Sequence, residues 1–314
     1  AGPTIAQRDL KEIPDPDPEL ERKTFIVPEG FEVSLWAGDP MMAKPIHMNF
    51  DERGRLWIAS SEVYPHIKPG EEAHDKILVL EDTDHDGRAD KTSVFADGLL
   101  IPTGVAPGDG GVYVANSTDL IHLRDTDGDG RADGHQVVLT GFGTQDSHLF
   151  PHQFTRVPGG FALVAQGLFN YSTVRRPEGK PFADGLKEVV FNQCKLARFT
   201  LDGARFENLT SGPNNIWGLT ISREGETWIQ EANDIGRPIV PYEPGVLIVP
   251  GSKDRLRPYQ PLQPATLNPP QMGGTGLSGL ALADDRDTPF KSKLATEVGA
   301  KIFFLANQIG RAHV

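Results

Sequence analysis

The sequence is poor in cysteine, with Cys194 as the single copy among its 314 residues. One cysteine cannot close an internal disulfide, and it cannot supply the cysteine pair of a haem attachment motif. We therefore expect Cys194 to be a small buried side chain. Helical periodicity is almost absent as well, and the short polar stretch 17–23 is the best candidate for a helix. No apolar run approaches the length of a membrane-spanning helix, which predicts no membrane span in this chain.

The chain is also short of positive charge. It carries 31 Lys and Arg against 43 Asp and Glu, a net charge of −12. Phosphate groups would be repelled by this excess, which argues against a nucleic acid as partner. A hydrophobic content of 38% is enough for a large core, so we expect one sizeable folded unit. The 34 Gly and 26 Pro are typical of many short strands joined by turns.

What the chain does contain is an acidic loop that occurs twice. Residues 82–90 read DTDHDGRAD, and residues 125–133 read DTDGDGRAD. Carboxylates at alternate positions point toward one centre, and the glycine allows a sharp turn, as in the first part of a calcium loop. The aspartates predicted to bind Ca²⁺ are Asp82, Asp84, Asp86, Asp90, Asp125, Asp127, Asp129 and Asp133.

These loops are not complete EF-hands. The twelfth position would be Ser93 or Gln136, so the bidentate glutamate of a full site is missing. We expect weak to moderate affinity, which suits a calcium-rich setting outside the cytoplasm. The alternative is a solvated acidic turn that holds no ion.

The duplication leads to a wider repeat. A hairpin pattern of alternating residues around a tight turn recurs at 50–60, 106–116, 156–166 and 222–232. A further strand is expected near each hairpin, at 76–82, 119–125, 195–203 and 245–251. A glycine-rich entry to an inner strand recurs at 98–106, 212–220 and 273–281. Units of roughly 40–60 residues with about four strands each predict an all-β fold, the β-propeller.

The two ends of the chain read differently from its middle. We expect residues 1–23 to be a linker or lead-in, residues 24–308 to be the propeller, and IGRAHV (309–314) to be a non-native tail, because it matches the translation of a common sequencing adapter. The stretch 300–308 reads as a strand that begins another blade. These features predict about five visible blades and a truncated C-terminus. The start at Ala1, without an apolar leader, fits a removed signal peptide or a fragment.

Four segments carry a resemblance to a known family: EGFEVSLWAGDP (29–40), the stretch 76–106, FGTQDSHLFPHQF (142–154) and MGGTGLSGLAL (272–282). They resemble the propeller domain of the bacterial membrane-bound dehydrogenase family, the N-terminal propeller of exported haem-binding proteins. That domain is similar to sorbosone dehydrogenase and soluble quinoprotein glucose dehydrogenase.

The resemblance implies a six-bladed β-propeller with a polar cavity at one end of its central channel. The cavity would hold pyrroloquinoline quinone and Ca²⁺, with a sugar or alcohol as substrate. A periplasmic or exported location follows, and a cytochrome c domain beyond the propeller would be a partner. The cofactor would supply the redox chemistry, and the protein would position it.

The resemblance also implies a catalytic histidine just before an inner strand. His148 is the nearest match, and His152 is the alternative. Relatives carry an Arg-Asn pair that contacts the quinone. Asn215 matches its asparagine, but Asn214 stands where arginine is expected, which removes a cation that would hold the acidic cofactor.

The stretch QEAND (230–234) matches an acidic loop near the calcium of those relatives. Glu231, Asn233 and Asp234 would offer oxygen ligands there. A simpler interpretation remains for the site residues: the histidines cap strands through hydrogen bonds, and the asparagines satisfy the backbone of turns.

The predicted function is that of an exported sugar or alcohol oxidoreductase, with hydride transfer to a quinone. The alternative is a non-catalytic, calcium-stabilised propeller that binds glycans or a partner domain, which the departure at Asn214 favours. A third option is a metal-dependent hydrolase or lactonase, for which Glu231 and Asp234 would have to converge on the channel axis.

Overall fold

The computed structural model describes residues 17–25, 32–211, 215–222, 224–232, 239–241, 277–283 and 302–307. Helix α1 (Pro18–Arg22) confirms the short helix expected at 17–23, and the Asp17 side chain caps it by accepting from the Glu19 and Leu20 N–H groups. Within the described part of the chain, no helix is long and apolar enough to cross a membrane.

The strands follow the predicted repeat. The first two sheets have four antiparallel strands each, in the orders β1-β2-β3-β4 and β5-β6-β7-β8. The first comprises β1 (Pro45–Phe50), β2 (Leu56–Ser60), β3 (Asp75–Glu81) and β4 (Lys91–Leu99). The second comprises β5 (Pro102–Gly108), β6 (Gly111–Asn116), β7 (Asp119–Arg124) and β8 (Gly134–Thr140).

The third sheet has the order β9-β10-β13-β14 and carries an inserted hairpin, β11-β12. Its strands are β9 (His152–Val157), β10 (Phe161–Gln166), β13 (Lys195–Thr200) and β14 (Phe206–Ser211). The inserted strands are β11 (Tyr171–Val174) and β12 (Val189–Asn192).

Two smaller sheets complete the described strands. The fourth comprises β15 (Ile216–Ile221), β16 (Thr227–Glu231) and β17 (Ile239–Pro241), and the fifth comprises β18 (Leu277–Ala283) and β19 (Ile302–Asn307). The expected strand at 245–251 lies outside the described residues. The sequence indicated that 300–308 begins another blade. Strand β19 instead pairs antiparallel with β18, so it is the second strand of the fifth sheet.

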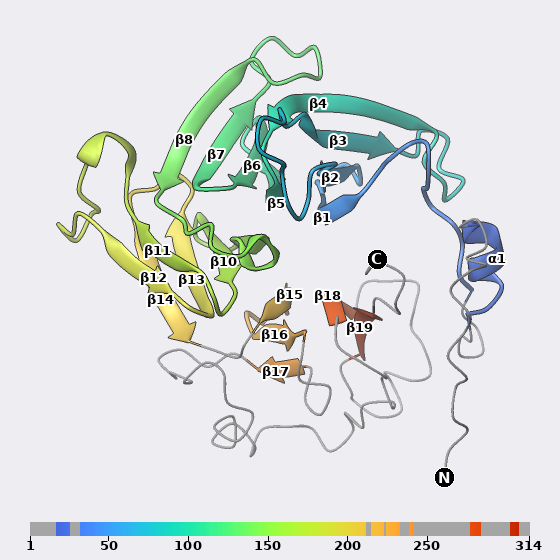
Figure 1. Ribbon diagram of the computed structural model, residues 1–314. Helices are drawn as coiled ribbons and strands as arrows, with labels where there is room; N and C mark the ends of the chain where they lie inside the picture. Colours follow the sequence, from blue (N-terminus) through green and yellow to red (C-terminus); the bar gives the residue numbers. More distant parts are fainter. Residues whose placement is uncertain are drawn as a thin grey trace.

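The five sheets follow one another around a ring (Figure 1). Their innermost strands contact each other in the sequence β1, β5, β9, β15 and β18. This arrangement is a β-propeller and confirms the predicted all-β fold class. The six-blade count stays a prediction.

Apolar and aromatic side chains fill the seams between neighbouring sheets. Trp57 and Phe95 meet edge to face at 4.7 Å in the seam between the first and second sheets. Phe142, Phe191 and Phe206 pack together between the second and third. Large rings bury much apolar area in such positions, which fixes the sheets against each other. The predicted burial of Cys194 is confirmed, since its side chain is buried against the fourth sheet.

Strand directions divide the connections between two faces of the propeller. Because neighbouring strands run antiparallel, the connection into each inner strand and the connection from second to third strand share one face. We call it the entry face; it carries 61–74 and 141–151. The connections from third to fourth strand lie on the opposite face. We call this the acidic face, because it carries 82–90 and 125–133.

The insertion 167–194, which we call the strap, bridges the second and third sheets. Directly after strand β11, Arg175 pairs with Thr140 at the end of β8. The two residues exchange backbone hydrogen bonds of 2.9 and 3.0 Å. Strand β12 of the strap is held by Asn208 of β14, whose Nδ2 donates to the Val190 carbonyl at 2.8 Å. Phe191 of the strap is fully buried in the seam beneath. The Thr173 N–H also donates to the Gly141 carbonyl at 2.9 Å, so the strap is attached to the start of the entry-face connection 141–151.

Candidate functional site

His148 lies on the entry face beside a carboxylate. It is the middle residue of a 3₁₀ turn, Ser147–Leu149, which Asp146 caps. Asp146 Oδ1 accepts the His148 backbone N–H at 3.0 Å and lies 3.1 Å from His148 Nδ1. A carboxylate accepts only from a protonated nitrogen, so the Nδ1–H donates, and in the neutral ring Nε2 keeps its lone pair. Since 46% of the side chain is exposed, Nε2 can act as a base toward a ligand.

Two aromatic side chains of the loop 61–74 face His148. The ring centroids of Tyr64 and His66 lie 5.4 and 6.3 Å from that of His148, both edge to face. Burial raises the pKa of Tyr64 to about 12, and the charge of Asp146 adds to the effect. Tyr64 therefore keeps its proton at neutral pH. Neither ring was among the sequence-predicted site residues. Their loop belongs to the first sheet, whereas His148 follows the second sheet, so no local pattern in the sequence joins them.

A buried carboxylate organises that loop. Asp75 is 1% exposed and accepts three hydrogen bonds. The donors are the Ser61 hydroxyl at 2.5 Å, the Glu62 N–H at 2.8 Å and the Ile101 N–H at 2.8 Å. The Ser61 Oγ in turn accepts the Tyr64 N–H at 3.1 Å. A buried carboxylate satisfied by several donors holds its partners firmly, so Tyr64 is placed against His148 by a rigid chain of contacts.

His152 occupies a different environment. It is fully buried, with Nδ1 against the Phe150 carbonyl, Nε2 against the Ile216 carbonyl, and its ring stacked on Trp217 at 4.2 Å. Burial lowers the pKa of His152 more than the two carbonyls raise it. Both ring nitrogens lie against backbone carbonyls, and the neutral ring can donate to one of them. The residue therefore sits between the turn before β9 and the start of β15. The geometry favours His148 over His152 as a base.

The remaining entry-face predictions are only partly described. Asn215 directly precedes β15, and its carbonyl accepts the Ala232 N–H at 2.9 Å. Glu231 is the last residue of β16, which places its backbone on the same face. Asn214, Asn233 and Asp234 lie outside the described residues. The topology thus brings the described members of the predicted site to one face, together with His148.

The acidic loops place three carboxylates around one point, as their spacing predicted. In each loop the oxygens of three aspartates lie within 4.8 Å of one another. The two groups are Asp82, Asp84 and Asp86, and Asp125, Asp127 and Asp129. Both groups lie on the acidic face, across the propeller from His148. They can hold a hard cation but cannot share one with the entry face.

The fourth aspartate of each loop lies outside these groups of three and bonds to a threonine of its own loop. Asp90 accepts the Thr83 hydroxyl at 2.6 Å and the Thr83 N–H at 3.2 Å. Asp133 accepts the same two groups of Thr126, at 2.5 and 2.9 Å. The threonine hydroxyls hold the pKa of both carboxyls below the usual range. These residues close the base of each loop, a role that the acidic spacing alone did not reveal.

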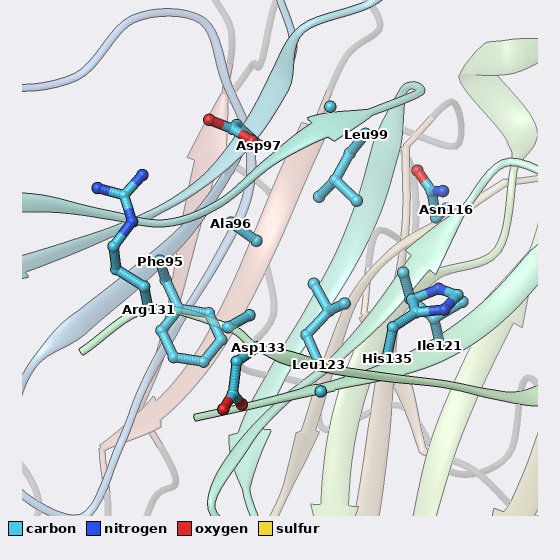
Figure 2. Close-up of a pocket in the computed structure, with 13 residues that line it drawn as sticks. Phe95, Ala96, Asp97, Leu99, Asn116, Ile121, Leu123, Arg131, Asp133 and His135 are labelled. Atoms are coloured by element: carbon cyan, nitrogen blue, oxygen red, sulfur yellow. The ribbon is translucent and has the colours of Figure 1, made fainter. Parts of the chain in front are cut away.

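A pocket of about 360 Å³ opens in the seam between the first two sheets (Figure 2). Its apolar floor includes Leu99, Ile121 and Leu123, and it is bordered by Asp97 of β4 and Arg131 of the second acidic loop. No sequence pattern predicted this pocket, because its walls come from different sheets. It lies away from the Asp146–His148 pair and shares no residue with it.

A family model described as "Domain of unknown function (DUF7133)" matches residues 17–248. The chain belongs to this family. The matched range includes both acidic loops and His148. No curated protein matches the chain.

Several solved structures are similar at low identity. The PQQ domain of pyranose dehydrogenase from Coprinopsis cinerea is 15% identical, with a TM-score of 0.45, over 65% of this chain and 47% of that one. A carbohydrate-active enzyme of family AA12 from Trichoderma reesei is 12% identical, with a TM-score of 0.48, over 70% and 56%. The chain thus spans about half the length of these two proteins.

The PQQ-bound aldose sugar dehydrogenase from Streptomyces coelicolor is 12% identical, with a TM-score of 0.41, over 76% of this chain and 72% of that one. The relation to sorbosone dehydrogenase and to the membrane-bound dehydrogenase family remains an expectation from the sequence.

Proposed function

We propose that this protein is an exported oxidoreductase of the quinoprotein dehydrogenase type, which acts on a hydroxyl group of a sugar or alcohol. The observation that carries the proposal is the Asp146–His148 pair, a half-exposed imidazole oriented by a carboxylate on the entry face. The resemblance seen in the sequence supports the same reaction class. Fold alone would not, since propellers serve many functions.

The chain's own residues account for the proton side of the reaction. His148 Nε2 accepts the proton of the substrate hydroxyl, and Asp146 holds the ring and stabilises the imidazolium that forms. The hydrogen on the carbinol carbon leaves with its electron pair, so the carbon becomes a carbonyl. A bound quinone would supply the acceptor for that hydride. Tyr64 and His66 border the imidazole and limit how a substrate approaches it.

The described residues fit this cofactor in part. They provide the base and its aromatic surroundings. Pyrroloquinoline quinone is acidic and calls for a cationic partner, and the position where the resemblance expects one holds Asn214, outside the described residues. We propose that Asn214 and Asn215 contact the cofactor or the substrate, and that Glu231, Asn233 and Asp234 hold an associated Ca²⁺.

The two acidic loops have a separate role in the proposal. Three carboxylates held within 4.8 Å of one another repel, and a cation between them would offset that repulsion. We assign them structural Ca²⁺ on the acidic face, which agrees with a periplasmic or exported location. A cytochrome c domain, beyond the present chain, is the proposed electron acceptor and partner.

The second candidate is a non-catalytic, calcium-stabilised propeller that binds glycans or a partner domain. The specific observation in its favour is Asn214 in place of arginine. The two candidates differ in whether the entry face does redox chemistry.

Reconstitution separates the candidates. The full-length protein is mixed with pyrroloquinoline quinone and Ca²⁺, and oxidation of a panel of aldoses and alcohols is followed with a dye acceptor. The oxidoreductase predicts turnover that depends on both additions and falls in His148→Gln. Sugar binding by calorimetry, without turnover in any condition, would contradict the oxidoreductase and support the alternative.

A further inference from the structure

Asn170, a residue of the strap, holds the backbone of Asp146 from both sides. Its side chain is fully buried. Its Oδ1 accepts the Asp146 N–H at 2.8 Å, and its Nδ2 donates to the Asp146 carbonyl at 3.1 Å. A primary amide that uses its acceptor and its donor on one residue fixes the orientation of the adjoining peptides. Asp146 is the residue whose carboxylate orients His148.

Asn170 is itself fixed by a buried polar network. Gln166, fully buried at the end of β10, donates to the carbonyls of Asn170 at 3.0 Å and Phe191 at 2.7 Å. Its Oε1 accepts from the Ser172 hydroxyl, and the Ser172 Oγ accepts the Gly143 N–H at 2.7 Å. A fully satisfied buried network is rigid, because breaking any member leaves an unpaired polar group away from water. The backbone that carries the Asn170 side chain therefore has little freedom to move.

The same segment also holds the far end of the turn that carries His148. The Gly167 N–H donates to the Leu149 carbonyl at 3.1 Å. A Cβ on Gly167 would overlap the Leu149 side chain, so the two segments lie in close contact. His148 thus sits between two anchored neighbours, and both anchors come from the first residues of the strap.

We infer that Asn170 is a positioning residue, which sets the tautomer and direction of the His148 imidazole through Asp146. The inference deepens the proposed function and relies on it only for the consequence on activity. Without the Asn170 amide, the Asp146 N–H and carbonyl lose their partners, and the carboxylate loses its fixed place under Nδ1. The Nδ1–H then has no preferred acceptor, and Nε2 is no longer the free nitrogen in most molecules.

The test reads the tautomer of His148 directly. Protein with ¹⁵N-labelled histidine is studied by NMR at about pH 9, where an ordinary imidazole is neutral. The His148 ring signals are assigned from the His148→Gln variant. Asp146→Asn gives the spectrum expected when the carboxylate is lost. Tyr64 and His66, the other titratable groups that face His148, are the same in every sample.

We expect Asn170→Ala to move the two His148 ring nitrogens most of the way to their positions in Asp146→Asn. The matched control is Asn208→Ala, which removes an asparagine that also holds the strap, through the Val190 carbonyl, but does not touch Asp146. The control should leave the His148 signals in place. Equal shifts in both variants would mean general loosening of the strap and would overturn the inference.

Unchanged His148 signals in Asn170→Ala would also overturn it. If that variant does not fold, Asn170→Ser replaces it, since its hydroxyl can fill one of the two hydrogen-bonding roles, and an intermediate tautomer shift is expected. Wild-type signals in that variant count against the inference in the same way. Absence of sugar oxidation by the wild type would remove the proposed function but leave the tautomer result standing, so the two failures are distinguishable.

Discussion

The two faces of the propeller are built in different ways. On the acidic face, each of the two groups of three carboxylates comes from a single turn, and both have the same spacing. On the entry face, Tyr64, the Asp146–His148 pair and Asn170 come from three separate connections. A site formed by one turn can be recognised in the sequence as a local pattern. A site assembled from several connections forms only when the sheets pack together, so no local pattern reveals it.

The acidic loops also share a long-range contact. In the second loop, the Ala132 N–H donates to the Phe95 carbonyl of the first sheet at 2.7 Å. In the first loop, the Ala89 N–H donates to the Trp36 carbonyl at 2.8 Å, in the segment that leads into β1. Each loop is thus attached to the segment preceding its own sheet. An ion there would stiffen a seam of the propeller as well as a turn.

The largest expected difference between the two faces is in activity, and replacing the proposed base, His148, tests it. We expect His148→Gln to lower kcat by about 10²- to 10⁴-fold in the reconstituted enzyme, because the hydroxyl proton loses its acceptor. Asp146→Asn should have a smaller effect in the same direction, since the imidazole remains but loses its orienting partner. Steady-state kinetics on one active aldose measures both.

The control for this experiment comes from the other face. Asp84→Asn alters an acidic loop across the propeller from His148, so kcat at saturating Ca²⁺ should stay near the wild-type value. A loss of kcat as large as that of His148→Gln would show that the two faces are not independent.

The next effect in size is the removal of Ca²⁺. A ligand present at about 100 times its Kd stabilises the folded state by about 2.7 kcal/mol, so a chelator should lower the Tm by several degrees. Asp82→Asn and Asp125→Asn should each remove part of this shift, and the double variant should leave only the part that belongs to the Ca²⁺ proposed on the entry face. A Tm that falls on chelation as far in the double variant as in the wild type would show that the acidic loops hold no stabilising ion.

The sheets could be predicted well from the sequence because their signals are local. The expected strands 76–82 and 119–125 differ by a residue or less at either end from β3 and β7, since alternation and turn residues act within a few positions. The stretch 300–308 was expected to begin another blade, and it instead pairs with β18 in the fifth sheet. Its pattern predicts a strand, but nothing within it says that β18 is the partner.

The candidate site was predictable only in its first member. His148 could be chosen because it lies just before an inner strand, a position that the resemblance marks. Tyr64 and Asn170 could not, because their roles depend on how the loop 61–74 and the strap meet the turn at His148. The roles of Thr83 and Thr126 were missed although they lie within the repeat, because a hydroxyl between two carboxylates is not part of the calcium-loop spacing.

Acid should act on His47, within the inner strand β1, and on the acidic loops in different pH ranges. Burial, with a smaller contribution from the nearby His152, lowers the pKa of His47 to about 3, and its Nδ1 accepts the Val105 N–H at 3.1 Å. Below about pH 6.5, His47 binds a proton in the unfolded chain but stays neutral in the folded protein. The free energy of unfolding therefore falls as the pH decreases toward 3. The slope is at most about 1.4 kcal/mol per pH unit.

His47→Gln should flatten that slope, measured by urea unfolding between about pH 5 and pH 7, because glutamine can accept a hydrogen bond without titrating. Asp90 and Asp133 have lowered pKa values, so their contribution is lost only at lower pH, below the ordinary value of 3.8. An unchanged slope in His47→Gln would assign the acid sensitivity of this range to another group.

The smallest effect compares the two acidic loops at the one position where they differ. His85 has φ +61°, and Gly128, its counterpart, has φ +82° and open space where a Cβ would lie. This left-handed backbone costs a non-glycine residue about 1 kcal/mol, whereas glycine adopts it freely. His85→Gly should therefore raise the Tm slightly, by less than that full amount, because glycine also gains freedom in the unfolded chain. Gly128→His should lower it. Both are measured in chelator, so that Ca²⁺ affinity does not contribute, and shifts of the same sign would mean that backbone strain does not distinguish the loops.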